Sequence, residues 1–473
     1  MAQYQLDGKT KFVYGLGAAP FGIKENGFSY FLLIFYSQVL GLQPFLTSLA
    51  LTLAIVVDAI TDPLIGYWSD NLRSKKWGRR HPFMYLSIIP ICLSYAVLWN
   101  PPTLVLDDQM HLFFYLLFCC ILIRVFLTFF EVPSTALISE LTSDYDARTE
   151  LMGLRFMFGW LGGIGMAFLA YSTFLAANEN GNGILQAGGY VKYGLAASAL
   201  MLVGMLVSSL GTHKAIPHLH VPPEQDKITP SVVLSEILDV FKNKNFQALF
   251  LASIFFGTAS GFTASLSIYF STFFWELKPS QLAIFTIFQA VAAVCAVPIA
   301  RFLGKKFDKK RAALGSFVVM LMVGPSMWLS RLGGLLPENG SDALFPILLT
   351  HNFLQVLIII VFYILFGSMM ADVVEDSAVD TARRNEGVIF AARAFAGKMV
   401  AGMGIMLAGL VLTLINLPRN AQPSEVPEET LIDLVLYAVP IEAFFYIAAF
   451  FMMKRYRITR RQHGENVEKV SSI

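Results

Sequence analysis

Two acidic residues lie one helical turn apart inside a long apolar stretch of this chain. The run LTLAIVVDAITDPLIGYW at 51–68 contains Asp58 and Asp62, and their spacing places both carboxylates on one face of a helix. Each acid at the centre of a membrane-embedded helix costs roughly 2.5 to 3.5 kcal/mol, so the pair must face a partner, a cavity or an ion. Asp58 and Asp62 are therefore the first candidates for chemistry.

The chemistry that suits this pair is the binding of a small cation. Hard cations such as Na+ prefer several oxygen ligands, and Asp58, Thr61 and Asp62 offer them from one helix face. Without a metal ion, two close carboxylates do not both ionise easily, so a proton is the other candidate ligand. The structural alternative is that the two acids pair with basic residues on neighbouring helices.

A second set of polar residues follows a helical stripe in the apolar run 111–139. Arg124, Thr128 and Glu131 are spaced four and three residues apart, so they share one face of a helix, and that face must point into the protein. Glu131 is either a substrate or coupling residue, or the partner of Arg124 or Arg155 in an ion pair.

Two further charged positions stand in apolar runs. Lys398 lies within ARAFAGKMVAGMG, where small residues permit close helix contact. It needs a carboxylate partner unless its ammonium group extends to the membrane surface. Glu25 directly follows Lys24, so it either takes part in substrate binding or pairs with that lysine.

These residues belong to a chain with the composition of a membrane protein. Of its 473 residues, 56% are hydrophobic and 14% are charged, and the mean hydropathy is +0.60, which is too apolar for a soluble protein. The four cysteines fall in apolar runs without disulfide or metal spacing, so we expect them to be packing residues. The first apolar run is too long for a signal-peptide core and is expected to span the membrane.

Twelve apolar runs predict an all-α membrane protein with twelve transmembrane helices. Each is about 20 residues long or more, which suffices to cross a bilayer. The expected spans are 12–40, 45–69, 83–100, 111–139, 152–176, 189–210, 245–275, 280–303, 312–331, 342–372, 388–416 and 431–453.

The distribution of Lys and Arg predicts the orientation of these spans. Basic residues cluster after the second span, after the eighth span and in the tail. In the connections 100–110, 177–188 and 417–430, by contrast, Arg419 is the only Lys or Arg. Because cytoplasmic loops are enriched in Lys and Arg, we expect both termini in the cytoplasm. We expect a multi-pass protein of the inner (plasma) membrane.

The chain also repeats itself. Gly66-x-x-x-Asp70 with a basic cluster recurs as Gly304-x-x-x-Asp308 with Lys309, Lys310 and Arg311, and SELTSDYDARTELMG at 139–153 is echoed by ADVVEDSAVDTARRNEG at 371–387. The repeat predicts two six-helix bundles, as in one large class of secondary transporters. The expected domains are 1–210, a cytoplasmic linker at 211–244, 245–453 and a basic cytoplasmic tail at 454–473.

Several motifs together resemble a known family. DAITDPLIGYWSD at 58–70, WGRRHP at 77–82, FFEVPSTAL at 129–137 and Lys398 are similar to the glycoside-pentoside-hexuronide:cation symporter family, typified by melibiose permease. That family belongs to the major facilitator superfamily. The resemblance implies alternating access and symport of a sugar or glycoside with Na+ or H+, with no other cofactor.

The resemblance also implies roles for individual residues. The cation site would consist of Asp58, Asp62 and Thr128, the sugar would contact Glu131 near Arg155, and Lys398 would lie between the two ligands. Two family features are missing, because no aspartate falls near Gly22 and no aromatic residue follows Glu131 at Thr135. Both gaps leave the transported solute open.

The duplicated loop motif implies a cytoplasmic gate in the superfamily. Asp70 with Arg79 or Arg80 would close one half, and Asp308 with Arg311 the other, with Gly66 and Gly304 at the matching positions. A solvated positive-inside surface explains the charges but not the repeated Gly-to-Asp spacing.

Other functions are weighed against symport. The same fold could carry a lysolipid or another organic solute, or act as a sensor or scaffold without transport. The hydroxyls of the seventh span either line a polar cavity or mark tight helix packing. An enzyme is not expected, because no nucleophile stands beside a plausible base. We expect a monomer with a small-molecule substrate, a coupling cation and membrane lipid as partners, and no nucleic acid.

Overall fold

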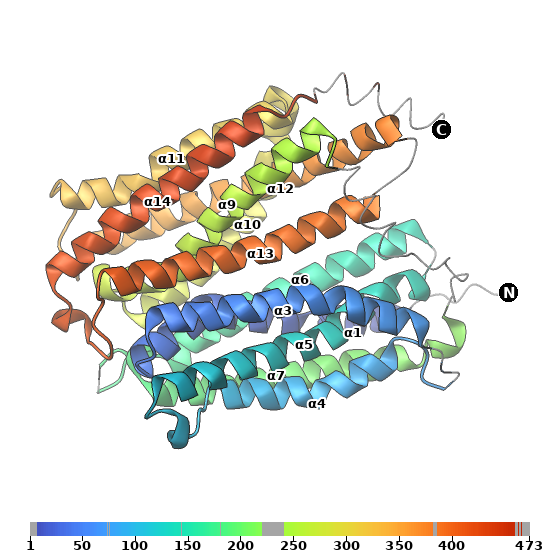
Figure 1. The fold of residues 1–473 in the computed structure, drawn as a ribbon, viewed down its shortest axis with the longest axis horizontal. Coiled ribbons are helices and arrows are strands. Elements are labelled where there is room, and N and C mark those ends of the chain that lie inside the picture. Colours follow the sequence, from blue (N-terminus) through green and yellow to red (C-terminus); the bar gives the residue numbers. More distant parts are fainter. Residues whose placement is uncertain are drawn as a thin grey trace. The chain divides into compact units, whose positions relative to one another are not determined.

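The chain folds entirely into helices and connecting segments in the part that the computed structural model describes, apart from one isolated bridge between Asn178 and Gly181 (Figure 1). This confirms the predicted all-α class. The described residues are 7–72, 74, 76–142, 144–179, 181–219, 241–381, 386–458, 462 and 465, with backbone alone at 145, 218, 374–375, 377–381 and 386–396.

The helices fall into two series along the chain. The first series comprises α1 Gly8–Leu16, α2 Ala19–Gly27, η1 Phe28–Leu32, η2 Phe35–Val39, α3 Pro44–Asn71, α4 His81–Leu98, η3 Thr103–Val105, α5 Gln109–Leu141, α6 Tyr145–Leu169, η4 Ala170–Phe174, η5 Gly183–Leu185, α7 Ala187–His213 and η6 Ile216–His218. The second comprises α9 Lys244–Tyr269, η7 Phe270–Phe274, α10 Pro279–Phe307, α11 Lys309–Leu332, α12 Leu344–Thr381, α13 Glu386–Leu414, η8 Pro423–Glu425 and α14 Glu428–Lys454. Most of the predicted linker 211–244 lies outside the described residues.

Two compact units emerge from the contacts within the chain. Unit 1 contains Met1–Glu224, Ala264–Ile284 and Ile405–Pro427, and unit 2 contains Gln225–Thr263, Phe285–Gly404 and Glu428–Ile473. Unit 1 therefore combines the first series of helices with short pieces from the second.

Eleven helices among the described residues are long and apolar enough to cross a membrane. The first predicted span, 12–40, is instead divided. Helix α1 ends at Leu16, and α2 begins at Ala19 with Pro20 in its first turn, where the missing N–H is tolerated. From Ala19 to Val39 the chain runs through α2, η1 and η2, and about 1.5 Å per residue makes this long enough for a bilayer core.

Two π-helical turns end in the same way in the two series. Each of the turns η2 and η7 contains one residue more than an α-helical turn. A residue with positive φ follows shortly after each turn, Gly41 (+78°) after η2 and Glu276 (+50°) after η7. The hydrogen bonds match: Leu40 N to Phe35 O 3.0 Å, Leu42 N to Tyr36 O 2.9 Å, Trp275 N to Phe270 O 2.9 Å and Leu277 N to Ser271 O 2.8 Å. A helix with an early proline follows both, at Pro44 and Pro279.

Glycines bring α2 and α6 into backbone contact in unit 1. A Cβ atom on Gly22 would lie 1.8 Å from the carbonyl oxygen of Gly159 and 3.0 Å from the amide nitrogen of Gly163. No side chain fits at this crossing. The position near which the resembled family carries an aspartate is therefore occupied by backbone packing.

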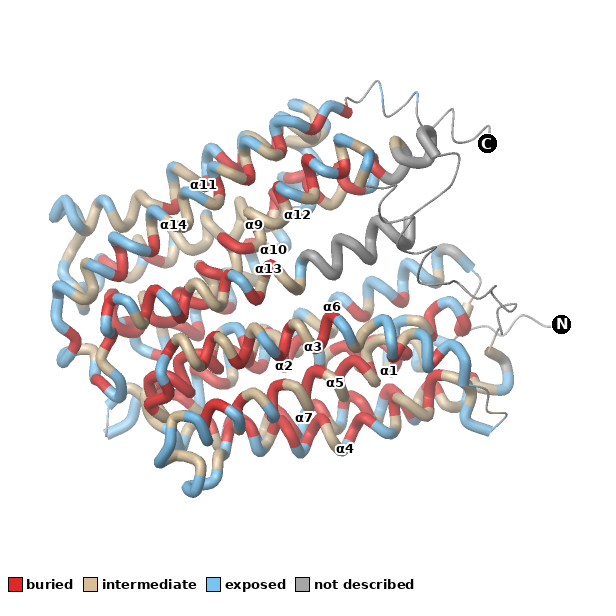
Figure 2. The backbone as a smooth tube through the Cα atoms, in the orientation of Figure 1, coloured by how far each residue is buried: buried red, intermediate tan, exposed pale blue. Residues whose placement is uncertain are grey.

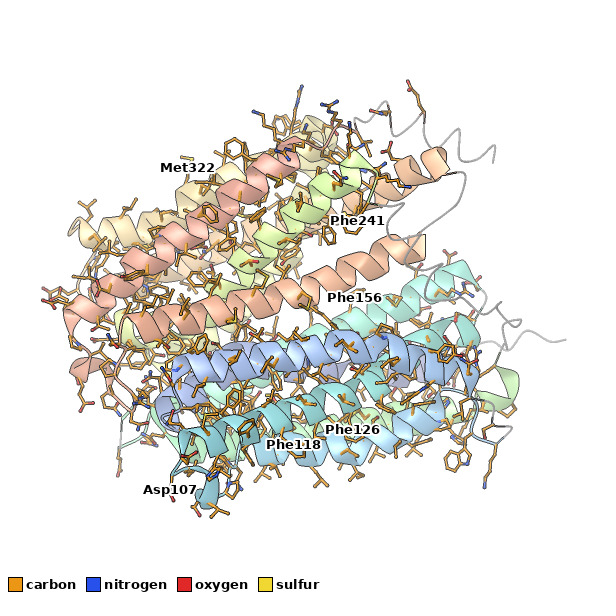
Figure 3. All side chains as sticks on the ribbon, viewed as in Figure 1. Asp107, Phe118, Phe126, Phe156, Phe241 and Met322 are labelled. Atoms are coloured by element: carbon orange, nitrogen blue, oxygen red, sulfur yellow. The ribbon has the colours of Figure 1, made fainter. Side chains whose placement is uncertain are left out.

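Helix α5 presents one continuous buried stripe, and its polar residues share that stripe with apolar ones. Its buried residues recur at helical spacing, so that Arg124 and Thr128 lie in line with Ile123 and Leu127 (Figure 2). Other faces carry large exposed side chains, such as Phe118, which is 61% exposed (Figure 3). Apolar outward faces suit contact with lipid.

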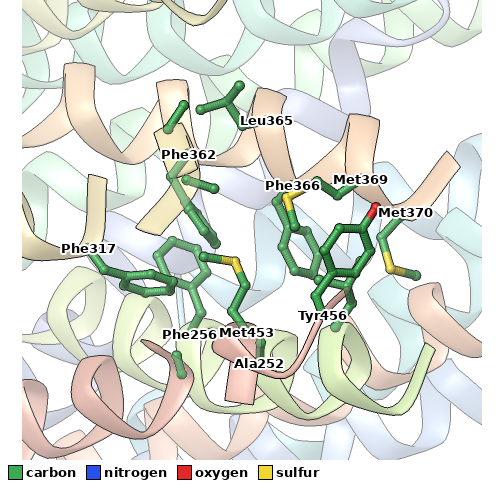
Figure 4. Packing of buried hydrophobic residues seen from close by; sticks show 14 of the residues in the cluster. Ala252, Phe256, Phe317, Phe362, Leu365, Phe366, Met369, Met370, Met453 and Tyr456 are labelled. Carbon is green, nitrogen blue, oxygen red and sulfur yellow. The ribbon is translucent and has the colours of Figure 1, made fainter. Parts of the chain in front are cut away.

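Unit 2 has its own aromatic and aliphatic core. Phe256 of α9, Phe317 of α11 and Phe362 of α12 pack together, with ring centroids 4.3 Å apart for Phe256 and Phe362 (Figure 4). Tyr446 of α14 closes the cluster, 5.8 Å from Phe256. This core joins α11, α12 and α14 of unit 2 to α9.

Within unit 1, the ends of α9 and α13 pack against the first series of helices. The hydroxyls of Ser37 and Tyr269 are 2.5 Å apart and buried. The amide of Phe45 donates to Thr413 Oγ1 at 3.1 Å, and a Cβ atom on Gly409 would lie 2.0 Å from Ser48 Oγ. These contacts join residues that are more than 200 positions apart in the sequence.

Candidate functional site

Asp58 and Asp62 of α3 meet the hydroxyl of Thr128 on α5. Thr128 Oγ1 is 3.0 Å from Asp58 Oδ1 and 2.9 Å from Asp62 Oδ1. It is also 3.0 Å from the carbonyl oxygen of Arg124 in its own helix. Asp58 and Thr128 are buried, and Asp62 is half-buried. Three of the four residues that were predicted for the cation site are thus brought together, and the fourth is Thr61.

Arg124 and Thr61 border this group in different ways. Arg124 Nη1 lies 3.2 Å from Asp58 Oδ2, and both side chains are nearly inaccessible. The predicted structural alternative, an acid paired with a base, is therefore present at Asp58. Thr61 Oγ1 donates at 3.2 Å to the carbonyl of Asp58, so its hydrogen is directed at its own helix.

Lys24 and Glu25 lie beside the same group, at the end of α2. Lys24, which is 2% exposed, forms an ion pair with Glu25. Both lie within Coulombic reach of Arg124 and Asp58. The ring of Phe28 has the Lys24 ammonium 5.5 Å and the Arg124 guanidinium 5.4 Å from its centroid, so it contacts two cations.

A second polar group centres on Arg155 of α6. Its Nη2 pairs with Glu131 Oε1 and donates to Thr135 Oγ1 at 3.0 Å, and its Nη1 donates to Ser134 Oγ at 2.7 Å. The other Glu131 oxygen, Oε2, is buried and has no hydrogen-bond partner among the described residues. One acceptor of the predicted substrate residue is therefore available.

Tyr14 and Ser134 complete this group, and neither was identified from the sequence. The Arg155 guanidinium lies 5.4 Å from the Tyr14 ring centroid, and Tyr14 Oη donates to the carbonyl of Ser134 at 2.8 Å. Ser134 is three residues after Glu131, so its helical spacing was the available signal. Tyr14 offered no such signal.

Lys398 belongs to unit 2 and is half-buried on α13. Its helix packs tightly on α9, because a Cβ atom on Gly404 would lie 2.7 Å from the carbonyl oxygen of Thr258. Several hydroxyls of α9 donate to carbonyls of their own helix, among them Ser253, Thr258 and Ser267.

The predicted gate residues of the first half form an ion-pair network in unit 1. Glu140 at the end of α5 accepts from Arg79 Nη2 and from Arg80 Nε, both at 2.8 Å. Arg80 also pairs with Asp70 and donates to Ser69 Oγ at 2.7 Å. A Cβ atom on Gly66 of α3 would lie 3.7 Å from Val132 Cγ1 of α5, which is an ordinary van der Waals distance, so this contact does not require glycine.

The matching motif of unit 2 uses its charges differently. Asp308 caps α11, because its carboxylate accepts from the Lys309 amide at 2.7 Å, and Arg311 is exposed. The ion pair is formed by Lys309, whose Nζ lies 2.7 Å from Asp372 Oδ1. Asp372 occupies the place in the second repeat that Glu140 has in the first. A Cβ atom on Gly304 would lie 3.3 Å from Leu365.

The donor set at Asp58 and Asp62 differs from that of a tight transition-metal site. Within the described residues, no group of three or more His, Cys, Asp and Glu side chains is arranged to hold a metal ion. Two carboxylates, a hydroxyl and a carbonyl are hard oxygen donors, which suit a small alkali cation or a proton.

The fold and the sequence both match known transport proteins. A family model described as MFS/sugar transport protein matches residues 13–460. The fold is similar to that in the crystal structure of the nucleoside transporter NupG, with a TM-score of 0.62, 14% identity, and coverage of 95% of this chain and 99% of that one.

Similar sequences include transporters of different solutes. An uncharacterized symporter of Synechocystis sp. is 26% identical, covering 96% of this chain and 95% of that protein. The isoprimeverose transporter of Lactiplantibacillus pentosus is 22% identical, covering 85% and 79%. The sodium-dependent lysophosphatidylcholine symporter 1-A of Danio rerio is 29% identical over 37% of this chain and 34% of its own length.

Proposed function

The chain belongs to the MFS/sugar transport protein family, and we propose that it is a symporter that couples cation entry to uptake of a sugar or glycoside by alternating access. The family match bears out the resemblance seen in the sequence motifs. Because the family is described as one of transport proteins, transport is the activity to explain. Symporters are among the similar sequences, and one of them is described as sodium-dependent.

One observation carries the cation part of this proposal. The single hydroxyl hydrogen of Thr128 faces three acceptor oxygens, from Asp58, Asp62 and its own helix. It can be donated fully to only one of them at a time. Oxygen lone pairs therefore converge beside two membrane-embedded carboxylates, and Na+ or H+ there would offset their charge.

The cargo part rests on Glu131. Its Oε2 atom is buried without a hydrogen-bond partner in the described part of the chain, next to the guanidinium of Arg155 and the hydroxyl of Thr135. Sugars present hydroxyl donors and acceptors, which such a carboxylate and guanidinium bind together. Isoprimeverose is a disaccharide, and the relative that is named for its transport supports a sugar.

We assign Lys398 the coupling role implied by the family resemblance. A lysine on α13 that responds to the charge of Asp58 and Asp62 would link cation binding to substrate binding through electrostatics. Glu25 pairs with Lys24, and in this proposal it contributes to the same electrostatic coupling.

The ion-pair networks serve as cytoplasmic latches in this proposal. Glu140 with Arg79 and Arg80 holds one loop, and Asp372 with Lys309 holds the repeated one. The protein would be a monomer in the inner membrane with both termini in the cytoplasm.

A lysolipid is the second candidate cargo. The observation in its favour is the 29% identity with the lysophosphatidylcholine symporter, although the match spans about a third of each chain. Competition assays separate the candidates, since a disaccharide and lysophosphatidylcholine would each displace only their own class of labelled substrate.

The Asp62→Asn variant tests the cation site. The wild-type protein is expected to gain thermal stability and uptake rate on addition of Na+, or on acidification if H+ is the coupling ion, because ligand that binds the folded state stabilises it. Asp62→Asn should lose most of this response while it remains folded. A cation response that is the same in both proteins would refute the assigned site.

A further inference from the structure

Arg124 is a charged side chain at the border of the proposed cation site. Its Nη1 atom lies 3.2 Å from Asp58 Oδ2, while Asp58 Oδ1 faces Thr128. A cation that binds at Asp58 and Asp62 must therefore approach a carboxylate that a guanidinium already contacts. This inference rests on the proposed function and concerns how the same site is regulated.

The contact between Arg124 and Asp58 is weak in geometry. A strong arginine–carboxylate pair is bidentate, with distances of about 2.7 to 2.9 Å. Here a single nitrogen makes the contact at 3.2 Å, and the buried Nε atom of Arg124 has no hydrogen-bond partner among the described residues. The guanidinium is thus held mainly by electrostatic attraction, and its release from Asp58 breaks a single hydrogen bond.

The Arg124 side chain also has alternatives to its contact with Asp58. The Phe28 ring centroid lies 5.4 Å from its guanidinium, and Glu25, which pairs with Lys24, lies within Coulombic reach of Arg124. A guanidinium that leaves Asp58 can keep its contact with the ring and approach the acid of α2. Movement of Arg124 on cation binding would thereby change the electrostatic environment of Lys24 and Glu25.

The charges near Asp58 explain why the two cations exclude each other. Within unit 1, the side chains of Lys24, Glu25, Asp58, Asp62 and Arg124 together carry one net negative charge. A guanidinium and Na+ on the same carboxylate repel each other strongly in an interior of low dielectric. Only one of them can hold Asp58 Oδ2 at a time.

We propose that Arg124 is a tethered competitor of the coupling cation, which holds Asp58 Oδ2 and is displaced from that oxygen when the cation binds. The arginine then lowers the apparent affinity for the cation and allows its release after substrate delivery. It acts as a positioning residue, because it touches the carboxylate and not the cation.

Equilibrium titration of the purified full-length protein with Na+ and, separately, with H+ tests this role. Thermal stability is the readout for wild type and for Arg124→Gln, Arg124→Met and Arg124→Lys. Removal of the positive charge in the first two variants is expected to lower the half-saturating cation concentration at least tenfold. Arg124→Lys keeps the charge and is expected to stay within about threefold of wild type. Arg331→Gln, at the end of α11, controls for loss of an arginine elsewhere.

The outcomes separate this inference from the function on which it rests. If wild type responds to neither cation, the proposed symport fails. If wild type responds and the folded Arg124→Gln or Arg124→Met protein needs the same or more cation, competition by Arg124 is overturned. Should neither neutral variant fold, Arg124→Lys decides, because tenfold tighter binding despite a retained charge contradicts the proposal.

Discussion

At the scale of single residues, the two acidic groups of unit 1 differ in how their oxygens are used. Asp58 has Oδ1 facing Thr128 and Oδ2 facing Arg124, so contacts reach both of its oxygens. Glu131 has one oxygen on Arg155 and one buried oxygen without a hydrogen-bond partner in the described residues. An acceptor of this kind is costly unless a ligand fills it. The difference suits an ion site whose carboxylate already has protein contacts, beside a substrate site with one open acceptor.

Glu131→Gln is expected to separate substrate binding from cation binding. Loss of a charged hydrogen-bond acceptor typically costs about 1.5 to 3 kcal/mol, so sugar affinity should fall roughly 10- to 150-fold. The cation-induced rise in thermal stability should remain, because Asp58, Asp62 and Thr128 are intact. Equilibrium binding of labelled sugar with parallel thermal melts measures both.

The matched control is Glu150→Gln, which removes an exposed acid that pairs with Lys11 on the surface. It should leave sugar and cation binding unchanged. Equal loss of cation response and sugar binding in Glu131→Gln would show that the two groups are one site.

The residues of the candidate site were predictable to different degrees. Asp58, Asp62 and Thr128 stood out because an acid or an in-line hydroxyl in an apolar helix is unusual. Phe28 and Tyr14, which contact Arg124 and Arg155, look like any aromatic residue in an apolar run. Their role depends on how α1 and α2 pack, and a single sequence carries no such information.

At the scale of elements, the repeated π turns determine how α3 and α10 begin. Both turns end at a residue with positive φ, which costs little for Gly41 but about 1 to 2 kcal/mol for a residue with a side chain such as Glu276. Regular apolar runs predicted the spans here, but the additional residue in each turn gave no periodic signal. Pro44 follows Gly41 by three positions, and Pro279 follows Glu276 by three positions. This shared spacing was the feature of the sequence that could have revealed the repeated turn.

Substitution at these two positions should change stability in opposite directions. Glu276→Gly is expected to stabilise the fold by about 1 kcal/mol, because glycine adopts positive φ without strain. Gly41→Ala should destabilise it by a similar amount. Thermal unfolding in detergent measures both, with transport as a check on folding. A lower melting temperature for Glu276→Gly would show that its side chain contributes more than its backbone strain costs.

At the scale of the whole molecule, unit 1 joins parts that the sequence repeat assigns to different halves. The ends of α9 and α13 pack on η2 and α3, through Ser37 with Tyr269 and through Ser48 with Gly409. The apolar runs predicted twelve spans and the repeat divided them into two series, and the structure describes eleven long helices plus the divided first one. The repeat could not predict these long-range contacts, because they depend on the conformation that the transporter adopts.

A cysteine pair can test whether this packing must open during transport. Ser48→Cys with Gly409→Cys should form a disulfide on oxidation once the two helices separate by about 1 Å, because disulfide Cβ atoms lie about 3.8 Å apart. A Cβ atom at 409 would otherwise lie 2.5 Å from Ser48 Cβ and 2.6 Å from the carbonyl oxygen of Pro44. Uptake should stop on oxidation and return with reductant. The four native cysteines are replaced in the background, and each single variant serves as control. Full uptake by the cross-linked protein would show that these segments stay together throughout the cycle.

The matching turns at Phe35–Val39 and Phe270–Phe274 also bear on the history of the gene. One additional residue in a helix corresponds to one inserted codon. Two separate insertions at the same distance before a proline are a less economical account than one insertion that was later copied. On the simpler account, an ancestral gene for six helices already carried the additional codon, and tandem duplication with fusion came afterwards.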